Sequence, residues 1–247
     1  MEEYDLKKFL EKYRNSTVDF FRFPGNYGDS LIWHGTMKLL SELNIKVDYI
    51  DLLSDKKNEV LLIDGGGNLV DYYTDVRNFL MTKPTLYKQI VILPHTIFGG
   101  KQIDILNNLQ SDTIIFCREM ISVDFVAKHI KRGKVYLWHD CAFYNSFENK
   151  AGGAGTLNAF RSDCESILQT KHDLSSDISY DGYATKPLDE FLEILQKYEY
   201  INTDRLHVAI ATTLMNKHVK LYPNSYYKNK AVFEYSLKKF PNIEFIE

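Results

Sequence analysis

The chain has 247 residues, which is enough for one large domain or for two compact ones. Its hydrophobic share of 45%, with 17 Tyr and 15 Phe, supports a sizeable core and excludes a largely disordered chain. The 30 basic and 33 acidic residues nearly balance, so neither nucleic acid nor a strongly anionic membrane surface is an expected partner.

Along the first half of the chain, helical periodicity alternates with short apolar runs of strand type. Helices are expected over residues 6–13, 29–43, 69–81, 102–109 and 121–130. Strands are expected over residues 17–21, 46–51, 59–63, 90–93, 113–117 and 135–138. The glycine-rich residues 64–68 should end one of these strands, and Pro94 should end another. This alternation predicts right-handed βαβ units around a mostly parallel sheet.

The small-residue segment 149–155 is the best candidate for a linker. Beyond it the sequence predicts strands over 155–160, 200–201 and 219–222, and helices over 187–198, 204–214 and 228–240. We therefore expect an α/β protein with two Rossmann-like parallel-sheet domains facing each other across a cleft. Residues 1–145 would form the N-terminal domain and residues 146–247 the C-terminal domain, with the boundary between residues 135 and 155.

The sequence predicts neither a metal nor a membrane span. Cys117, Cys141 and Cys164 form no CxxC pair, and the histidines show no H-x-x-x-H spacing. No run approaches the roughly 20 apolar residues that a membrane span needs. A cytoplasmic protein is expected, associated at most peripherally with the inner face of the membrane.

Three loops follow expected strands and carry glycine or polar residues, at residues 25–29, 64–68 and 94–96. In doubly wound sheets ligands bind beyond the carboxyl ends of strands, and glycine lets the backbone approach an anion closely. Tight turns that need a positive φ would show the same glycines, so both interpretations stay open. Neither of the two glycine-containing loops, 25–29 and 64–68, matches the dinucleotide G-x-G-x-x-G or the P-loop pattern.

A second signal is the pair of cations Arg205 and His207 at the start of an expected helix, with Thr203 or Asp204 as its cap. Cations in a first turn oppose the helix dipole, and a bound anion would remove that conflict. The alternative is an exposed arginine paired with Asp204 or Glu199 beside a half-buried histidine.

Three further cations stand in comparable places. Arg161 follows a strand-like run, although taken alone it is more typical of a surface arginine. Lys228 and Lys230 open the last expected helix, where an anion is favoured but where a solvated charged end is also common.

Taken in order, several segments resemble the polysaccharide pyruvyl transferase family. They are residues 25–29 (GNYGD), 64–69 (DGGGNL), 93–97 (LPHTI), 117–119 (CRE), 139–143 (HDCAF), 160–165 (FRSDCE) and 203–210 (TDRLHVAI). The resemblance covers the chain from about residue 20 onward. It implies a fold similar to the GT-B glycosyltransferases and no resident cofactor.

The resemblance also implies a reaction. Family members move the enolpyruvyl unit of phosphoenolpyruvate, a co-substrate, onto a sugar of a lipid-linked or nucleotide-linked glycan, leaving a pyruvate ketal and releasing phosphate. Arg205, Leu206 and His207 would occupy the family's R-x-H site, with Arg161 as a second donor-binding arginine. Guanidinium groups can bind the carboxylate and phosphate of such a donor bidentately.

Roles for the other residues follow from this scheme. His207 would be the general acid that protonates the enol carbon, and Asp29 or Asp64 would accept the proton of the sugar hydroxyl. Lys228 and Lys230 would neutralise the leaving phosphate. The residues expected to bind the acceptor lie in the three N-terminal loops and are Gly25, Asn26, Asp29, Gly66, Asn68 and His95.

Two alternatives to pyruvyl transfer stay open at this point. A GT-B-like glycosyltransferase would hold the diphosphate of a nucleotide sugar on Arg205 and Lys228. A non-catalytic family member would bind its ligand without turnover. A homo-oligomer is also left open.

Overall fold

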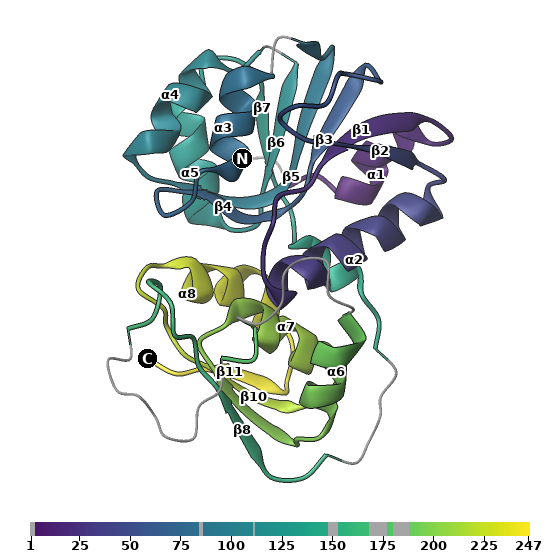
Figure 1. The fold of residues 1–247 in the computed structure, drawn as a ribbon. Helices are drawn as coiled ribbons and strands as arrows, with labels where there is room; N and C mark the ends of the chain where they lie inside the picture. The colour runs from purple at the N-terminus through teal and green to yellow at the C-terminus, as the bar shows by residue number, and fades with distance from the viewer. Residues whose placement is uncertain (1–2, 84–85, 111, 148–152, 168–176, 180–187) are drawn as a thin grey trace. The chain divides into compact units, whose positions relative to one another are not determined.

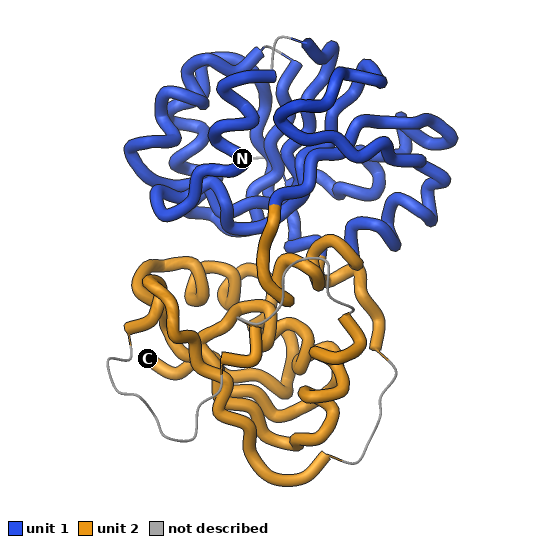
Figure 2. The backbone as a smooth tube through the Cα atoms, in the orientation of Figure 1, with its two compact units in different colours: residues 1–23, 35–141 blue, residues 24–34, 142–247 orange. Residues whose placement is uncertain are grey.

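The computed structural model describes residues 3–83, 86–110, 112–147, 153–167, 177–179 and 188–247. The chain splits into two compact units, drawn in different colours in Figure 2: unit 1 comprises Met1–Phe23 and Gly35–Cys141, and unit 2 comprises Pro24–His34 and Ala142–Glu247. Helix α2 (Tyr27–Glu42) therefore contributes its first half to unit 2 and its second half to unit 1. The predicted domain of residues 1–145 differs from unit 1 because residues 24–34 and 142–145 group with unit 2.

Unit 1 is built on a seven-stranded sheet whose strand pairs are all parallel, as the sequence predicted. The order is β2-β1-β3-β5-β6-β7, and β4 pairs with β5. The strands are β1 (Thr17–Phe21), β2 (Lys46–Ile50), β3 (Val60–Ile63), β4 (Gly66–Val70), β5 (Gln89–Phe98), β6 (Thr113–Cys117) and β7 (Lys134–Leu137).

The strand order of unit 1 reverses direction between β1 and β3. Because crossovers are right-handed, this reversal places α2 on one face of the sheet and the later helices on the other. Figure 1 shows α3, α4 and α5 together on one side, with α1 and α2 on the opposite side. These helices are α1 (Leu6–Leu10), α3 (Asp75–Thr82), α4 (Gly100–Asn108) and α5 (Met120–His129).

Two expectations for unit 1 were wrong, and they have one cause. Strand β5 does not stop at Pro94, because its register against β6 shifts between Ile92 and His95, and a proline is tolerated at such an irregularity. The extension beyond Pro94 offers a free edge, to which Leu69 and Val70 pair. Residues 66–70 therefore form strand β4 rather than a strand-ending loop and the start of a helix, and α3 begins later, at Asp75.

Unit 2 holds a four-stranded parallel sheet in the order β11-β10-β9-β8. The strands are β8 (Thr156–Ala159), β9 (Tyr200–Thr203), β10 (His218–Leu221) and β11 (Ile243–Phe245). The helices are α6 (Leu188–Gln196), α7 (Leu206–Leu214) and α8 (Lys228–Val232), the last continued by one π-helical turn over Phe233–Leu237. The sequence predicted neither β11 nor the π-helical turn.

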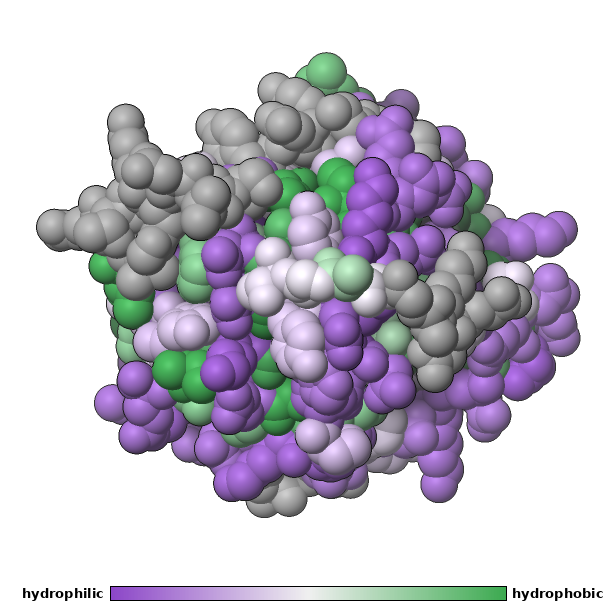
Figure 3. Space-filling model, turned by 90° about the horizontal axis from the view of Figure 1, so that it is seen from below, coloured by the Kyte–Doolittle hydropathy of each residue, from purple (hydrophilic) through white to green (hydrophobic). Residues whose placement is uncertain are grey.

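Because this second sheet is wound in one direction only, right-handed crossovers place α6, α7 and α8 on the same face. Along β9 and β10 exposed and buried residues alternate, and Tyr200, His218 and Lys220 are exposed on the opposite face. This alternation is typical of a sheet covered on one side. Seen from below in Figure 3, the described surface mixes hydrophilic and hydrophobic residues.

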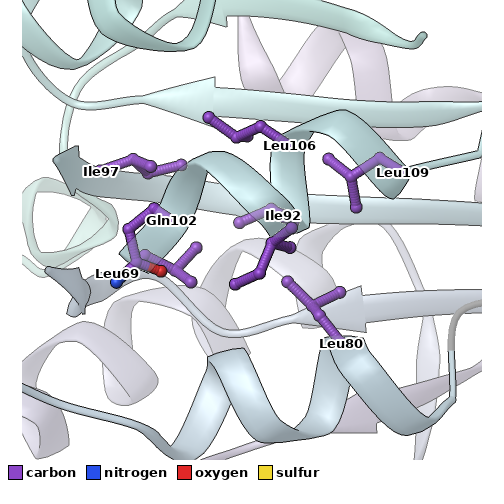
Figure 4. Close-up of a pocket in the computed structure, with 8 residues that line it drawn as sticks. Leu69, Leu80, Ile92, Ile97, Gln102, Leu106 and Leu109 are labelled. Atoms are coloured by element: carbon purple, nitrogen blue, oxygen red, sulfur yellow. The ribbon is translucent and has the colours of Figure 1, made fainter. Parts of the chain in front are cut away.

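A small apolar cavity lies between the sheet of unit 1 and helices α3 and α4 (Figure 4). One polar side chain, Gln102 of α4, lines it among aliphatic ones. Gln102 is buried, its Oε1 has no hydrogen-bond partner among the described residues, and its Nε2 lies 3.4 Å from Asp71 Oδ1. The other lining residues are Leu69, Leu80, Ile92, Ile97, Ile105, Leu106 and Leu109.

We expect Gln102→Leu to raise the free energy of unfolding by about 1–2 kcal/mol, because an unsatisfied buried acceptor costs about 1–3 kcal/mol. Urea denaturation measures the change. Gln89→Leu is the matched control and should destabilise the protein, because Gln89 Oε1 accepts a hydrogen bond from the Tyr13 hydroxyl. A Gln102→Leu protein less stable than wild type would show that the weak contact with Asp71 matters more than the unsatisfied oxygen.

Candidate functional site

Three cations of unit 2 gather at the carboxyl ends of neighbouring parallel strands. Arg161 follows β8, Arg205 follows β9, and Lys228 begins α8 after β10. Their side chains are only 5%, 6% and 9% exposed. We call these three residues the cation cluster. It occupies the edge of the sheet where ligands of α/β proteins bind.

Two carboxylates from the turn after β8 neutralise Arg161 and Lys228. Arg161 Nε lies 2.7 Å from Asp163 Oδ1, and Arg161 Nη1 lies 2.8 Å from Glu165 Oε2. Glu165 Oε2 also pairs with the ammonium of Lys228 and accepts a hydrogen bond from Asn224 Nδ2 at 3.1 Å. Glu165 therefore links the turn after β8 to the start of α8.

Arg205 is buried and paired, which differs from the alternative of an exposed arginine bound to Asp204 or Glu199. Its Nε and Nη2 both donate to the carboxylate of Asp177, and Nη2 also lies 3.2 Å from Asp163 Oδ2. Burial raises the pKa of the Asp163 carboxyl, but hydrogen bonds and charge interaction with Arg161, together with the charge of Arg205, outweigh this effect and leave the pKa below its ordinary value.

Asp204 holds the backbone next to the cation cluster. Its Oδ1 accepts a hydrogen bond from the backbone N–H of Arg161 at 2.8 Å, and its carbonyl accepts one from Asn229 Nδ2 at 2.6 Å. Its Oδ2 is buried without a hydrogen-bond partner in the described part of the chain. Burial raises the pKa of Asp204 to about 6, against the lowering influence of the Arg161 N–H. This carboxyl therefore takes up a proton at a higher pH than an ordinary aspartate does.

Helix α7 begins at Leu206, so Arg205 is its N-cap residue rather than part of its first turn as predicted. Leu206 itself is buried in the core. Within the described residues the side chain of Arg205 makes no capping hydrogen bond, and Thr203 Oγ1 accepts the backbone N–H of Arg205 at 3.0 Å, so the positive end of the helix dipole lies at the cation cluster. His207 stands in the first turn and is half-buried.

The first turn of α2 lies against His207, inside unit 2. A methyl group added at Gly28 would stand 2.6 Å from His207 Nδ1 and 3.1 Å from its Cβ. Asn26 Oδ1 accepts the N–H of Gly28 at 2.7 Å, and Asp29 Oδ2 accepts the N–H of Asn26 at 2.8 Å. This is the reciprocal arrangement of a capping box, so the Asp29 carboxylate caps α2 in this structure. Gly25 is required beside it, because a Cβ there would lie 2.1 Å from Asp29 Oδ2.

The remaining predicted acceptor residues belong to unit 1, so the predicted set is divided between the two units. Asp64 Oδ1 accepts hydrogen bonds from Thr36 Oγ1 at 3.1 Å and from the N–H of Gly65 at 2.9 Å. Asn68 uses its amide to hold the start of α3, accepting the Val76 N–H at 3.0 Å. Gly66, at the start of β4, has a φ of 143°, which L-residues rarely adopt.

His95 is fully buried in unit 1, and neither ring nitrogen has a hydrogen-bond partner among the described residues. Burial, and then the nearby charge of Arg118, lowers the pKa of His95 to about 3. Arg118 donates to Asp140 Oδ2 at 2.6 Å and to Thr96 Oγ1 at 2.9 Å, and the Arg118–Asp140 pair is almost completely buried. No individual role was predicted for Arg118 or Asp140, although a charged residue directly after an apolar strand, as Arg118 is after β6, was a signal for one.

A model of the polysaccharide pyruvyl transferase family matches residues 26–225 of this chain. The chain belongs to the polysaccharide pyruvyl transferase family. Its fold is also that of a crystal structure of a functionally uncharacterised protein from Klebsiella pneumoniae subsp. pneumoniae NTUH-K2044. The two are 29% identical, the match covers 98% of this chain and 96% of the other, and the TM-score is 0.82. No curated protein sequence matched.

The family match contains Arg161, Arg205 and His207 but ends before Lys228 and Lys230. The two lysines differ in their surroundings. Lys228 belongs to the cation cluster, whereas the Lys230 ammonium is exposed and pairs with Glu247 at 2.8 Å. Among the described residues, no group of three or more His, Cys, Asp or Glu is arranged to hold a metal ion. No helix of this part of the chain is long and apolar enough to cross a membrane.

We expect Gly28→Ala to displace the imidazole of His207, because the new methyl group would overlap it. The ring signals of His207 in a two-dimensional NMR spectrum should shift, with a change in melting temperature of only a few degrees. Gly100→Ala is the matched control, since a Cβ at Gly100 meets no atom within 4 Å. An unchanged His207 signal in Gly28→Ala would show that the first turn of α2 moves and the imidazole ring does not.

The buried neutral His95 should make folding sensitive to acid. Its pKa is lower in the folded state than in the unfolded state, so its contribution is complete above about pH 6.5 and is lost as pH falls from there toward 3. The unfolding free energy of wild type relative to His95→Leu should therefore fall by up to about 1.4 kcal/mol per pH unit in that window.

The opposite effect of Asp204 cancels in this comparison because both proteins contain Asp204. His218→Leu, at an exposed position, is the control. A wild-type minus His95→Leu difference that stays constant from pH 7 to pH 4 would contradict the assignment of a neutral buried imidazole.

Proposed function

We propose that this protein transfers the enolpyruvyl unit of phosphoenolpyruvate to a sugar of a surface-polysaccharide precursor, forming a pyruvate ketal and releasing phosphate. Family membership supports the reaction type. The observation that carries the choice of donor is the cation cluster, whose Arg205 is the N-cap residue of α7, two residues before His207. A donor with one carboxylate and one phosphate matches two guanidinium groups and an ammonium.

In this proposal Arg205 and Arg161 hold the two anionic groups of the donor, and Lys228 neutralises the phosphate as it leaves. The N–H groups of the first turn of α7 add their dipole to the same charge. Lys230, exposed and paired with Glu247, is less suited to the role that the sequence suggested for it.

His207 is proposed as the general acid. It gives a proton to the methylene carbon of the donor, so that the neighbouring carbon becomes an oxocarbenium-like electrophile. A sugar hydroxyl then attacks that carbon and loses its proton to a base, and the phosphate departs with the electron pair of its C–O bond. A second hydroxyl of the same sugar then attacks the oxocarbenium carbon left by the phosphate and passes its proton to the now neutral His207, which closes the ketal.

Asp29 is a better candidate for the base than Asp64, because Asp29 shares unit 2 with His207. To act in this way, its carboxylate would have to exchange the hydrogen bond from Asn26 for one from the sugar. We further propose that the two units form a GT-B-like pair, that the acceptor is lipid-linked or nucleotide-linked, and that the reaction takes place in the cytoplasm, where such precursors are assembled.

Arg205→Ala should weaken phosphoenolpyruvate binding, measured by calorimetry, whereas His207→Ala should bind it normally and lower kcat by about 10²- to 10⁴-fold. Turnover is followed as phosphate release that requires both phosphoenolpyruvate and a pool of nucleotide-linked and lipid-linked sugars. His218→Ala, on the exposed sheet face of unit 2, is the control.

Two results would contradict the proposal. Tight binding of UDP or GDP without binding of phosphoenolpyruvate would indicate a nucleotide-sugar donor. Wild-type turnover in His207→Ala would remove the acid role, and the absence of turnover with every acceptor pool would favour a non-catalytic member.

A further inference from the structure

The cation cluster has no net positive charge left for a ligand. Three cations are matched by three carboxylates, those of Asp163, Glu165 and Asp177. A donor with a carboxylate and a phosphate would bring at least two more negative charges among side chains that are nearly buried. Buried charges without partners are strongly disfavoured, so one carboxylate of the chain must give up its position when such a donor binds.

Two of the three carboxylates are fixed by several partners. Asp163 binds two nitrogens of Arg161 and accepts the N–H of Glu165 at 3.1 Å. Glu165 is held by Arg161, Lys228 and Asn224. Both belong to the turn that Arg161 itself opens, so their removal would disrupt the cluster.

Asp177 is different because it comes from another part of the chain and binds the Nε and Nη2 groups of Arg205 through its two oxygens. Its remaining hydrogen bonds come from the N–H and the hydroxyl of Ser162, at 2.8 and 2.9 Å. A small carboxylic acid binds an arginine in the same bidentate way. Asp204, by contrast, accepts a hydrogen bond from the backbone N–H of Arg161.

We propose that Asp177 is an internal competitor of the donor: its carboxylate occupies the position on Arg205 that the carboxylate of the donor takes in the complex. This inference rests on the proposed function, since it takes phosphoenolpyruvate as the donor. Asp177 keeps Arg205 neutralised and oriented while the site is empty. The observed affinity is lower than the intrinsic affinity, because only the state in which Asp177 has left Arg205 can bind.

The competition also provides selectivity. We assign the carboxylate of the donor to Arg205 and its phosphate to Arg161 and Lys228, so a ligand that carries a carboxylate gains most from displacing Asp177. Inorganic phosphate, which has no carboxylate, should gain little when Asp177 is removed, whereas phosphoenolpyruvate and pyruvate should both gain.

Asp177→Asn tests the proposal, because it removes the charge and keeps the shape. We expect calorimetry to show phosphoenolpyruvate and pyruvate binding about 5- to 20-fold more tightly than to wild type, with a smaller change for inorganic phosphate. Glu244→Gln makes the same change in net charge at an exposed position of unit 2 and should leave all three affinities unchanged. Asp177→Ala should also tighten binding, and it serves as the second variant in case Asp177→Asn folds poorly.

Weaker or unchanged binding of phosphoenolpyruvate in both folded Asp177 variants would overturn the inference, and weaker binding of all three ligands would identify Asp177 as a positioning residue for Arg205. Those outcomes leave the proposed function intact, provided that wild type binds phosphoenolpyruvate. If wild type binds UDP or GDP and no phosphoenolpyruvate, the proposed function and this inference fail together.

Discussion

The carboxyl edge of unit 2 depends on the requirement that three buried cations receive counter-charges. Asp163 pairs with Arg161 and Arg205, so it connects the segments after β8 and β9. Glu165 pairs with Arg161 and Lys228, so it connects the turn after β8 to α8. Buried ion pairs of this kind add little net stability, but removing one partner commonly costs 3–5 kcal/mol, about half of a typical domain's stability. The network therefore fixes the relative positions of these segments.

The buried ion pair of unit 1 differs from those of unit 2 in its exposure to solvent. Arg118 and Asp140 are 1% and 0% exposed, and Thr96 takes a further hydrogen bond from the guanidinium group. In unit 2 the side chain of Asp163 is 22% exposed, so solvent and small solutes reach the network there. Charges closed off from solvent hold a fold, whereas charges that a ligand can reach are able to exchange partners. This difference favours unit 2 as the location of the donor site.

The sequence predicted most elements because apolar periodicity reports which face of a strand or helix is buried. It failed at β4, where Gly66 and Pro94 indicated chain breaks and long-range pairing with β5 decided otherwise. It identified Arg161, Arg205 and Lys228 as candidate anion ligands but not their partners. Asp177 lies in a stretch without periodicity, and its carboxylate is held by Arg205 and Ser162. The contact of Gly28 with His207 likewise joins residues far apart in the chain, which no local pattern encodes.

The winding of the second sheet explains why the cations meet. In a sheet whose order reverses, as in unit 1, successive loops move away from the switch point in two directions. In unit 2 the order β8-β9-β10-β11 never reverses, so each loop at the carboxyl edge is next to the one before it. Arg161, Arg205 and Lys228 follow three consecutive strands, so the topology brings them to neighbouring loops, where the ion pairs then fix their positions. One face of this sheet is left uncovered by the described helices, and the polar residues along β9 and β10 make it compatible with water.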